Sequence, residues 1–230
     1  MFSIAIDGPS GSGKSTIAKR IARRFTAAGT QTVYVDTGAL YRALAYFLLQ
    51  NLSENDLDDG EQVARACEEV RVSLHYEDGR QVVTVNGEDV TDRLRTEAVS
   101  RLTSRIAVYP AVRDTLLQLQ RRMAKHYNVV MDGRDIGTCV LPEANVKIFL
   151  EASAEIRAKR RYDELVLRGE TADYEQVLND IIVRDERDRN RKVAPLRQAA
   201  DAVLLDTSTM DIQAVEEAVM VVCTERLCVK

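Results

Sequence analysis

The residues best suited to chemistry lie near the start of the chain, where GPSGSGKS (8–15) fits GxxxxGK[ST] at every fixed position. An apolar run, FSIAID, precedes this stretch and a helical pattern follows it, which is the strand, loop and helix context that the motif requires. Glycines allow such a loop to curl, so that successive N–H groups and the positive end of the helix point at a phosphate. The alternative is a Gly/Ser-rich turn that matches by chance. We expect the following residues to bind the phosphates of a nucleoside triphosphate: Gly8, Pro9, Ser10, Gly11, Ser12, Gly13, Lys14, Ser15 and Thr16.

Two side chains of this loop and one acid from a later strand have specific expected roles. Lys14 would reach the β and γ phosphates, and the Ser15 hydroxyl would be a ligand of Mg²⁺. The apolar run NVVMD ends in Asp132, and an acid at the end of a strand beside the loop could hold the metal or its waters. The alternative for Asp132 is a helix cap or a turn carboxylate. The sequence predicts a magnesium site at Ser15 and Asp132.

A second charged stretch, VRDERDRNRKVAP (183–195), has two possible interpretations. It could be a solvated helix with many ion pairs, or a cluster that binds an anion. Helical spacing puts four side chains on one face, where we expect the anion: Arg184, Arg187, Asp188 and Arg191. Asp185 and Arg189 are four residues apart on another face, where a solvated ion pair is expected.

These residues fit some classes of phosphate-binding protein better than others. The NKxD motif with which GTPase switches recognise guanine is absent, which argues against that class. A small-molecule or nucleotide kinase needs no partner protein, only a second site for its acceptor. Arg42, Arg113 and Arg134 follow predicted strand ends or loops, and an anionic phosphate acceptor needs cations rather than a base. Asp36 or Asp135 could serve as a base, so a hydroxyl acceptor stays open. Both a kinase for another small acceptor and a nucleotide-binding switch remain alternatives.

The elements that must position these residues alternate along the chain. Apolar runs predict strands at 2–7, 31–36, 128–132, 145–152 and 202–206. Helical periodicity predicts helices near 14–28, 39–50, 61–70, 92–107, 110–126, 154–168, 173–190 and 211–226. Residues 71–91 alternate with period two and contain Asp78-Gly79 and Asn86-Gly87, which predicts an antiparallel meander. The fold class is therefore α/β, a parallel sheet flanked by helices with a small antiparallel insert.

Length, composition and charge limit the remaining possibilities. A chain of 230 residues with 45% hydrophobic and 30% charged residues is typical of one globular domain. The net charge of −4 argues against a nucleic-acid-binding protein. No apolar run approaches the ~18 residues of a membrane span, and residues 1–7 begin a strand rather than a signal peptide. The cysteines form no CxxC pair, so we expect reduced thiols in a cytoplasmic protein: Cys67, Cys139, Cys223 and Cys228.

The motifs taken together resemble those of the bacterial cytidylate kinases, which are nucleoside monophosphate kinases. The resemblance covers essentially the whole chain and is carried by GPSGSGKST, DTGALYR (36–42), DGRDIGT (132–138), VKIFLEAS (146–153) and RDERDRNRKVAPL (184–196), together with the insert at 71–91. It implies Mg²⁺-dependent transfer of the γ-phosphoryl group of ATP to CMP or dCMP, giving CDP or dCDP and ADP, in pyrimidine metabolism. It also implies a monomer.

The resemblance assigns roles to individual residues. Ligands of the acceptor phosphate would be Thr37, Arg42 and Arg134. The cytosine edge would be read by Ser104, Arg113 and Asp135. The sugar would be bound by Arg184 and Asp188, with Arg191 nearby. Arg160 and Arg161 are candidates for the triphosphate side, and as adjacent helical residues they cannot share one face. The catalytic set would be Lys14, Arg134, Arg160 and Arg184.

The resemblance also divides the chain by function. A single P-loop kinase domain would comprise a core of residues 1–60, 92–153 and 192–230. Residues 61–91, a helix plus the meander, would be an insert of the monophosphate-binding region, and residues 154–191 would be the lid. Because water at the reacting phosphate would hydrolyse ATP, we expect residues 160–190 and the insert to close over the substrates.

Overall fold

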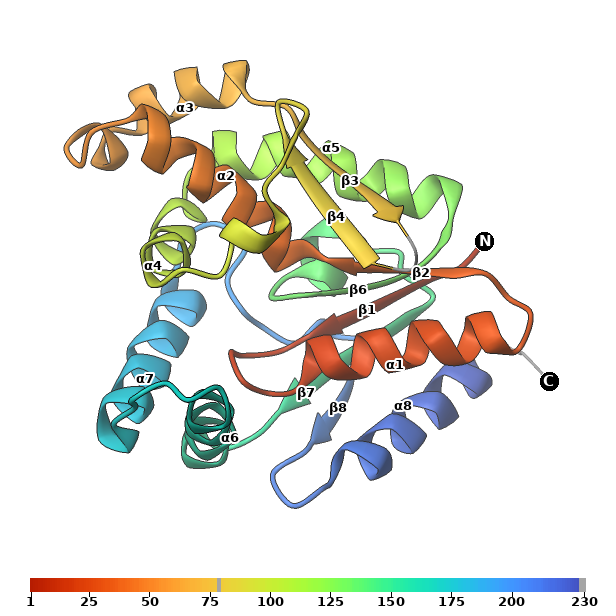
Figure 1. Cartoon of the computed structure of the whole chain (residues 1–230). Helices are drawn as coiled ribbons and strands as arrows, with labels where there is room; N and C mark the ends of the chain where they lie inside the picture. The colour runs from red at the N-terminus through yellow and green to blue at the C-terminus, as the bar shows by residue number, and fades with distance from the viewer. Residues whose placement is uncertain (78–79, 228–230) are drawn as a thin grey trace. The chain divides into compact units, whose positions relative to one another are not determined.

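The computed structural model describes residues 1–77 and 80–227, and it contains the expected α/β architecture (Figure 1). The main sheet has five strands in the order β2-β6-β1-β7-β8, namely Thr32–Asp36, Asn128–Gly133, Ser3–Asp7, Val146–Glu151 and Val203–Asp206. Strand β1 pairs in parallel with β6 and with β7, and β7 pairs in parallel with β8. The predicted parallel sheet is thereby confirmed. Since β1 is central, the loop that follows it opens at the carboxyl edge, where open α/β sheets bind ligands.

The chain forms two compact units, residues 1–34 with 126–230, and residues 35–125. In the first unit, helices α1 (Lys14–Ala27) and α8 (Ile212–Leu227) pack beside each other, as Figure 1 shows. Alternate residues of the strands, such as Ile4 and Ile6 of β1, point at the apolar side of these helices. Ile21 of α1 and Val219 of α8 complete this core. Burial of this face fixes the direction in which α1 leaves the loop at 8–13.

The same unit contains two long charged helices, α6 (Ala154–Leu167) and α7 (Tyr174–Asn190). Their starts are set locally, because Ser153 and Asp173 are N-caps that accept hydrogen bonds from Ile156 N–H and Gln176 N–H. A short π-helical turn, Ile136–Val140, follows β6 and was not expected from the sequence.

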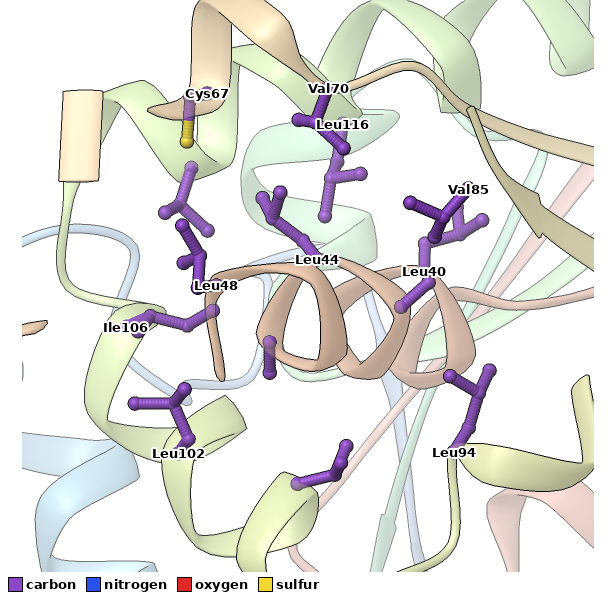
Figure 2. Close-up of a cluster of buried hydrophobic side chains, with 14 of the residues drawn as sticks. Leu40, Leu44, Leu48, Cys67, Val70, Val85, Leu94, Leu102, Ile106 and Leu116 are labelled. Atoms are coloured by element: carbon purple, nitrogen blue, oxygen red, sulfur yellow. The ribbon is translucent and has the colours of Figure 1, made fainter. Parts of the chain in front are cut away.

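The second unit, residues 35–125, has a separate core around α2 (Thr37–Asn51). Figure 2 shows Leu40, Leu44 and Leu48, spaced four residues apart along α2, within this cluster. Around them pack side chains of α3 (Gly60–Glu69), α4 (Glu97–Ile106) and α5 (Pro110–His126). The unit also contains short 3₁₀ turns at Asp56–Asp58 and Thr91–Arg93. A continuous helix over 92–107 was therefore wrong at its start, because Thr96 caps α4 by accepting a hydrogen bond from Val99 N–H.

The predicted meander is confirmed as a three-stranded antiparallel sheet of β3 (Val72–Glu77), β4 (Arg80–Val85) and β5 (Glu88–Asp89). Asn86 and Gly87 connect β4 to β5 with φ of 50° and 87°, the left-handed conformations of a tight hairpin turn. The other expected turn, Asp78-Gly79, lies outside the described residues, as does Cys228.

Two further expectations concern the whole chain. Within residues 1–77 and 80–227, no helix combines the length and apolar character needed to cross a membrane. Cys67, Cys139 and Cys223 form no disulfide in that part of the chain. The assignment of 61–91 as an insert that binds the monophosphate, and of 154–191 as a lid, concerns binding and motion and stays a prediction.

Candidate active site

The loop of residues 8–13 has the backbone that a phosphate cradle needs. Gly8, Gly11 and Gly13 have φ of 154°, 77° and 86°, which side-chain-bearing residues rarely adopt. A Cβ at Gly8 would lie 2.2 Å from the Leu150 carbonyl oxygen, so the loop passes directly against β7. Gly13 is the N-cap of α1, and its left-handed conformation turns the chain into the helix. The predicted loop therefore ends at a helix N-terminus, as anion binding requires.

Lys14 is buried at the base of this loop, where its Nζ donates a 2.6 Å hydrogen bond to the Pro9 carbonyl. Burial, Arg134 and Arg184 together outweigh the opposing effects of Asp132 and Asp188, and the pKa of Lys14 is lowered to about 7. Several cations thus converge on Lys14 in this unit. Such a cluster is costly alone and is stabilised by an anion.

Asp132 ends the hydrophobic part of β6 and lies directly beside the loop, as predicted. Its Oδ2 accepts a 2.7 Å hydrogen bond from the Ser15 hydroxyl, and its Oδ1 accepts one of 2.8 Å from Tyr34 Oη. A hydroxyl and a carboxylate are oxygen ligands of the kind that Mg²⁺ prefers. No group of three or more His, Cys, Asp or Glu side chains suited to a metal occurs among the described residues. A metal here would therefore depend on ligand oxygens in addition to these two.

Asp7, at the end of β1, is a buried carboxylate that was not among the residues expected from the sequence. Its two oxygens accept 2.8 Å hydrogen bonds from Ile136 N–H and Gly137 N–H. It therefore fixes the π-helical turn that directly follows Arg134 and Asp135. Burial, with a smaller contribution from Asp135, outweighs the opposing effects of the two N–H donors and Lys14, and the pKa of Asp7 is raised to about 7.

The raised pKa of Asp7 predicts a pH dependence of stability that the Asp7→Asn variant should lack. A carboxyl group with a folded pKa near 7 contributes stability that is fully present below the unfolded pKa, about 3.8, and lost as pH rises toward 7. The wild-type free energy of unfolding should fall relative to the variant by up to about 1.4 kcal/mol per pH unit across this window. Urea unfolding at several pH values from about 4 to about 8 measures the slope. Parallel curves for the two proteins would contradict the assignment.

A second group of predicted residues lies between β6 and α7 in the same unit. Arg134 Nε donates a 2.8 Å hydrogen bond to Asp188 Oδ2, and Arg191 lies 3.6 Å from Asp135 Oδ1. Burial opposes the charge on Asp188, but Arg134, Arg184 and Arg191 outweigh it and lower its pKa. Asp188 is therefore an ionised side chain held among arginines. The structure thus brings together five residues that the sequence assigned to the acceptor: Arg134, Asp135, Arg184, Asp188 and Arg191.

The expected faces of α7 need two corrections. Asp185 was expected to form a solvated ion pair with Arg189, but Asp185 is buried and binds Arg157, at 2.6 Å. Arg189 instead lies 3.4 Å from Glu151. Arg187, expected on the anion-binding face, is exposed. Tertiary packing of α6 against α7 decides these positions, and helical spacing alone does not.

Arg160 and Arg161 differ in their surroundings, as adjacent residues of a helix should. Arg160 donates hydrogen bonds to the Thr207 carbonyl, at 2.6 Å, and to Thr207 Oγ1. Arg161 forms an exposed pair with Glu164. Their role toward a triphosphate stays a prediction. The arginine of this helix that does contact the loop is Arg157, whose NH1 donates a 2.9 Å hydrogen bond to the Ser10 carbonyl.

Beside Arg157 lies a cleft of about 550 Å³. Its walls come from the ends of β7 and β8, the start of α6 and the second half of α7, and include Ser153, Arg157, Asp185 and Ser208. Because Arg157 both lines the cleft and donates to Ser10, the cleft adjoins the phosphate loop.

The other predicted ligands belong to the unit of residues 35–125. Thr37 is buried at the first position of α2, and Arg42, one turn along, donates a 2.9 Å hydrogen bond to Asp36 Oδ2. Asp36 also caps α2 through Ala39 N–H, and its own N–H donates to Gln81 Oε1 of the meander. The Nε of Arg42 is buried and has no hydrogen-bond partner among the described residues.

Ser104 of α4 and Arg113 of α5 are also buried in this unit. The Ser104 hydroxyl has no hydrogen-bond partner among residues 1–77 and 80–227, and such an oxygen is available to a ligand.

Four residues of the site were not predicted from the sequence: Asp7, Tyr34, Gln81 and Arg157. An acid directly before the loop was a usable signal for Asp7, whereas nothing local distinguishes Arg157 from the neighbouring arginines.

Comparison with known proteins identifies the family. The family model described as cytidylate kinase matches residues 4–225. The curated cytidylate kinase of Anoxybacillus flavithermus is 46% identical over 226 residues, covering 98% of this chain and 97% of that protein. The cytidylate kinase of Bacillus subtilis is 45% identical over 220 residues, covering 95% of each. A solved structure of an uncharacterized protein from Eubacterium ventriosum shares the fold, with a TM-score of 0.53, 14% identity and coverage of 98% and 99%. The chain belongs to the cytidylate kinase family of phosphotransferases.

Proposed function

We propose that this protein transfers the γ-phosphoryl group of ATP to CMP or dCMP, giving CDP or dCDP and ADP. The observation that carries the proposal is the cation cluster of Lys14, Arg134 and Arg184 beside a glycine-rich loop at a helix N-terminus. Family membership supports the same reaction. In the transfer, an oxygen of the acceptor phosphate forms a bond to the γ-phosphorus while the bond to the β–γ bridging oxygen breaks.

The residues of the first unit would hold the donor and the transferred group. The loop N–H groups and Lys14 bind the phosphates and neutralise charge that develops during the transfer. Arg134 and Arg184 add positive charge on the acceptor side. Ser15 and Asp132 are the proposed ligands of Mg²⁺, which when bound supplies further neutralisation of the phosphate charge. The cleft beside Arg157 adjoins the loop, and we assign it to the nucleoside of the donor.

The acceptor needs cations and hydrogen-bonding groups rather than a general base, because its phosphate is already anionic. Thr37, Arg42 and Arg134 are the proposed phosphate ligands. Ser104, Arg113 and Asp135 are proposed to read cytosine, whose amino group suits a carboxylate and whose ring acceptors suit an arginine. A uracil would place an oxygen where cytosine has its amino group, against the Asp135 carboxylate. Arg184 and Asp188, with Arg191, are the proposed partners of the sugar.

Two further parts of the proposal concern the protein as a whole. The three described thiols fit a reducing compartment, and we assign the enzyme to the cytoplasm. We also propose that it acts as a monomer, with residues 154–191 closing over the nucleotides as a lid.

An ADP-release assay over a panel of nucleoside monophosphates tests this function. We expect ADP release with CMP and dCMP that requires Mg²⁺, and at least about 100-fold lower kcat/KM with AMP and GMP, whose rings do not fit a pyrimidine site. Release with a non-nucleotide acceptor alone would favour a kinase for another small molecule. Slow hydrolysis that no acceptor accelerates would favour a nucleotide-binding switch.

A further inference from the structure

Arg157 is a buried cation that contacts three parts of the first unit, namely the phosphate loop, the residue after β7 and helix α7. Its Nε donates a 2.8 Å hydrogen bond to the Ala152 carbonyl, its NH1 a 2.9 Å bond to the Ser10 carbonyl, and its NH2 a 2.6 Å bond to Asp185 Oδ2. The side chains of Arg157 and Asp185 are only 4% and 8% exposed. Ser10 lies in the phosphate loop, Ala152 lies just after β7, and Asp185 lies in the second half of α7.

The phosphate loop also packs directly on this residue. A Cβ at Gly11 would lie 3.1 Å from the Cβ of Arg157, and the φ of Gly11 is 77°. The first turn of α6 is therefore the wall against which the loop rests. Displacement of Arg157 would move that wall and remove the hydrogen bond to the Ser10 carbonyl.

Asp185 connects the same contact to the acceptor side. It lies one residue from Arg184 and three from Asp188, and Asp188 binds Arg134 at 2.8 Å. The Oδ1 of Asp185 is buried without a hydrogen-bond partner among the described residues, so its carboxylate depends on the guanidinium of Arg157 for neutralisation. A buried carboxylate half satisfied in this way is held firmly to its cation.

We propose that Arg157 and Asp185 form a clasp that makes the position of α7 dependent on the conformation of the phosphate loop, so that binding of one nucleotide strengthens binding of the other. The inference rests on the proposed function, since it takes ATP as the ligand of the loop and CMP as the ligand of Arg184 and Asp188. Both clasp residues also line the cleft assigned to the donor nucleoside, so the test of their positioning role is the ratio of two affinities and not the affinity for ATP itself. Because such coupling is reciprocal, CMP should change the affinity for ATP by the factor by which ATP changes the affinity for CMP.

Calorimetric titration of a non-hydrolysable ATP analogue, with and without saturating CMP, measures this factor. For the wild type we expect CMP to tighten binding of the analogue by about 5-fold or more. Asp185→Asn and Arg157→Lys, which weaken the ion pair or lose the forked geometry, should reduce the factor toward one. The matched controls are Asp180→Asn on α7 and Arg168→Lys at the end of α6, two exposed residues that should keep the wild-type factor.

If a single variant does not fold, the double variant Arg157→Met with Asp185→Leu tests the clasp in its place. Apolar pairs of similar volume often preserve stability where a buried ion pair is removed, and this pair cannot form the clasp. Melting temperatures of all variants establish that they are folded. A folded clasp variant that retains full coupling, or a wild type that binds both nucleotides without coupling, would overturn the clasp alone. A wild type that binds the analogue but never CMP would overturn the proposed function instead.

Discussion

The Lys14→Met variant should remain folded and lose most of its activity, with kcat about 100- to 1000-fold below that of the wild type. Methionine has a similar reach and fills the buried space, so the packing of the loop is kept. The variant lacks the ammonium group that donates to Pro9 and that lies among Arg134 and Arg184. Charge that develops on the transferred phosphoryl group would then be neutralised by fewer cations. Steady-state kinetics with ATP and CMP measure the effect.

The matched control is Lys159→Met, the same exchange at an exposed lysine of α6 that pairs with Asp163. It should leave kcat within about 2-fold of the wild type, because exposed pairs contribute little. If Lys14→Met raised only the KM for ATP and left kcat unchanged, Lys14 would contribute to binding without contributing to the transfer step.

The Gly8→Ala variant should lose about 3 kcal/mol or more of its free energy of unfolding, a large loss for the addition of one methyl group. Its Cβ would lie 2.2 Å from the carbonyl oxygen of Leu150, and the φ of 154° is itself unfavourable for alanine. The carbonyl belongs to β7, which pairs with β1, so it cannot move away without disrupting the sheet. Urea unfolding measures the difference in free energy.

The Gly29→Ala variant separates the cost of the close approach to Leu150 from the cost of the backbone conformation. Gly29 follows α1 with φ of 86°, and a Cβ there would meet nothing within 4 Å. Its loss should be about 1 kcal/mol, the cost of the backbone conformation alone. Equal losses in the two variants would show that the close approach to Leu150 contributes nothing.

The order of elements could be predicted from the sequence because its signals are local. The strand NVVMD is a short apolar run bounded by polar residues, and the observed β6 (Asn128–Gly133) begins at its first residue. Period-two alternation and Asn86-Gly87 specified the β4 to β5 hairpin, since only such residues readily adopt its left-handed turn. The predicted start of α4 was too early, because the chain first forms a separate 3₁₀ turn and the helix begins only after its capping residue, Thr96.

The surroundings of the individual arginines of α6 could not be predicted from the sequence. Arg157, Arg160 and Arg161 lie within five residues on one helix and have the same chemistry, yet one is buried against the phosphate loop, one binds Thr207 and one is exposed. Asp185 had a suitable partner at helical spacing in Arg189, but it binds Arg157 instead. Packing of α6 against α7 buries Asp185, and a buried carboxylate without a cation would be strongly destabilising, so Asp185 pairs with the buried Arg157 rather than with the exposed Arg189.

By itself, the sequence determined the phosphate loop, with Lys14 and Ser15, and the placement of Asp132 at the adjacent strand end. A phosphate loop is a property of consecutive backbone groups, and a strand end in a parallel sheet has a fixed neighbourhood. Only the tertiary structure decided that Asp7 holds the turn after Arg134 and that Arg157 joins Ser10 to Asp185. Those contacts connect residues 28 to 147 positions apart, and their energies depend on burial that no local pattern specifies.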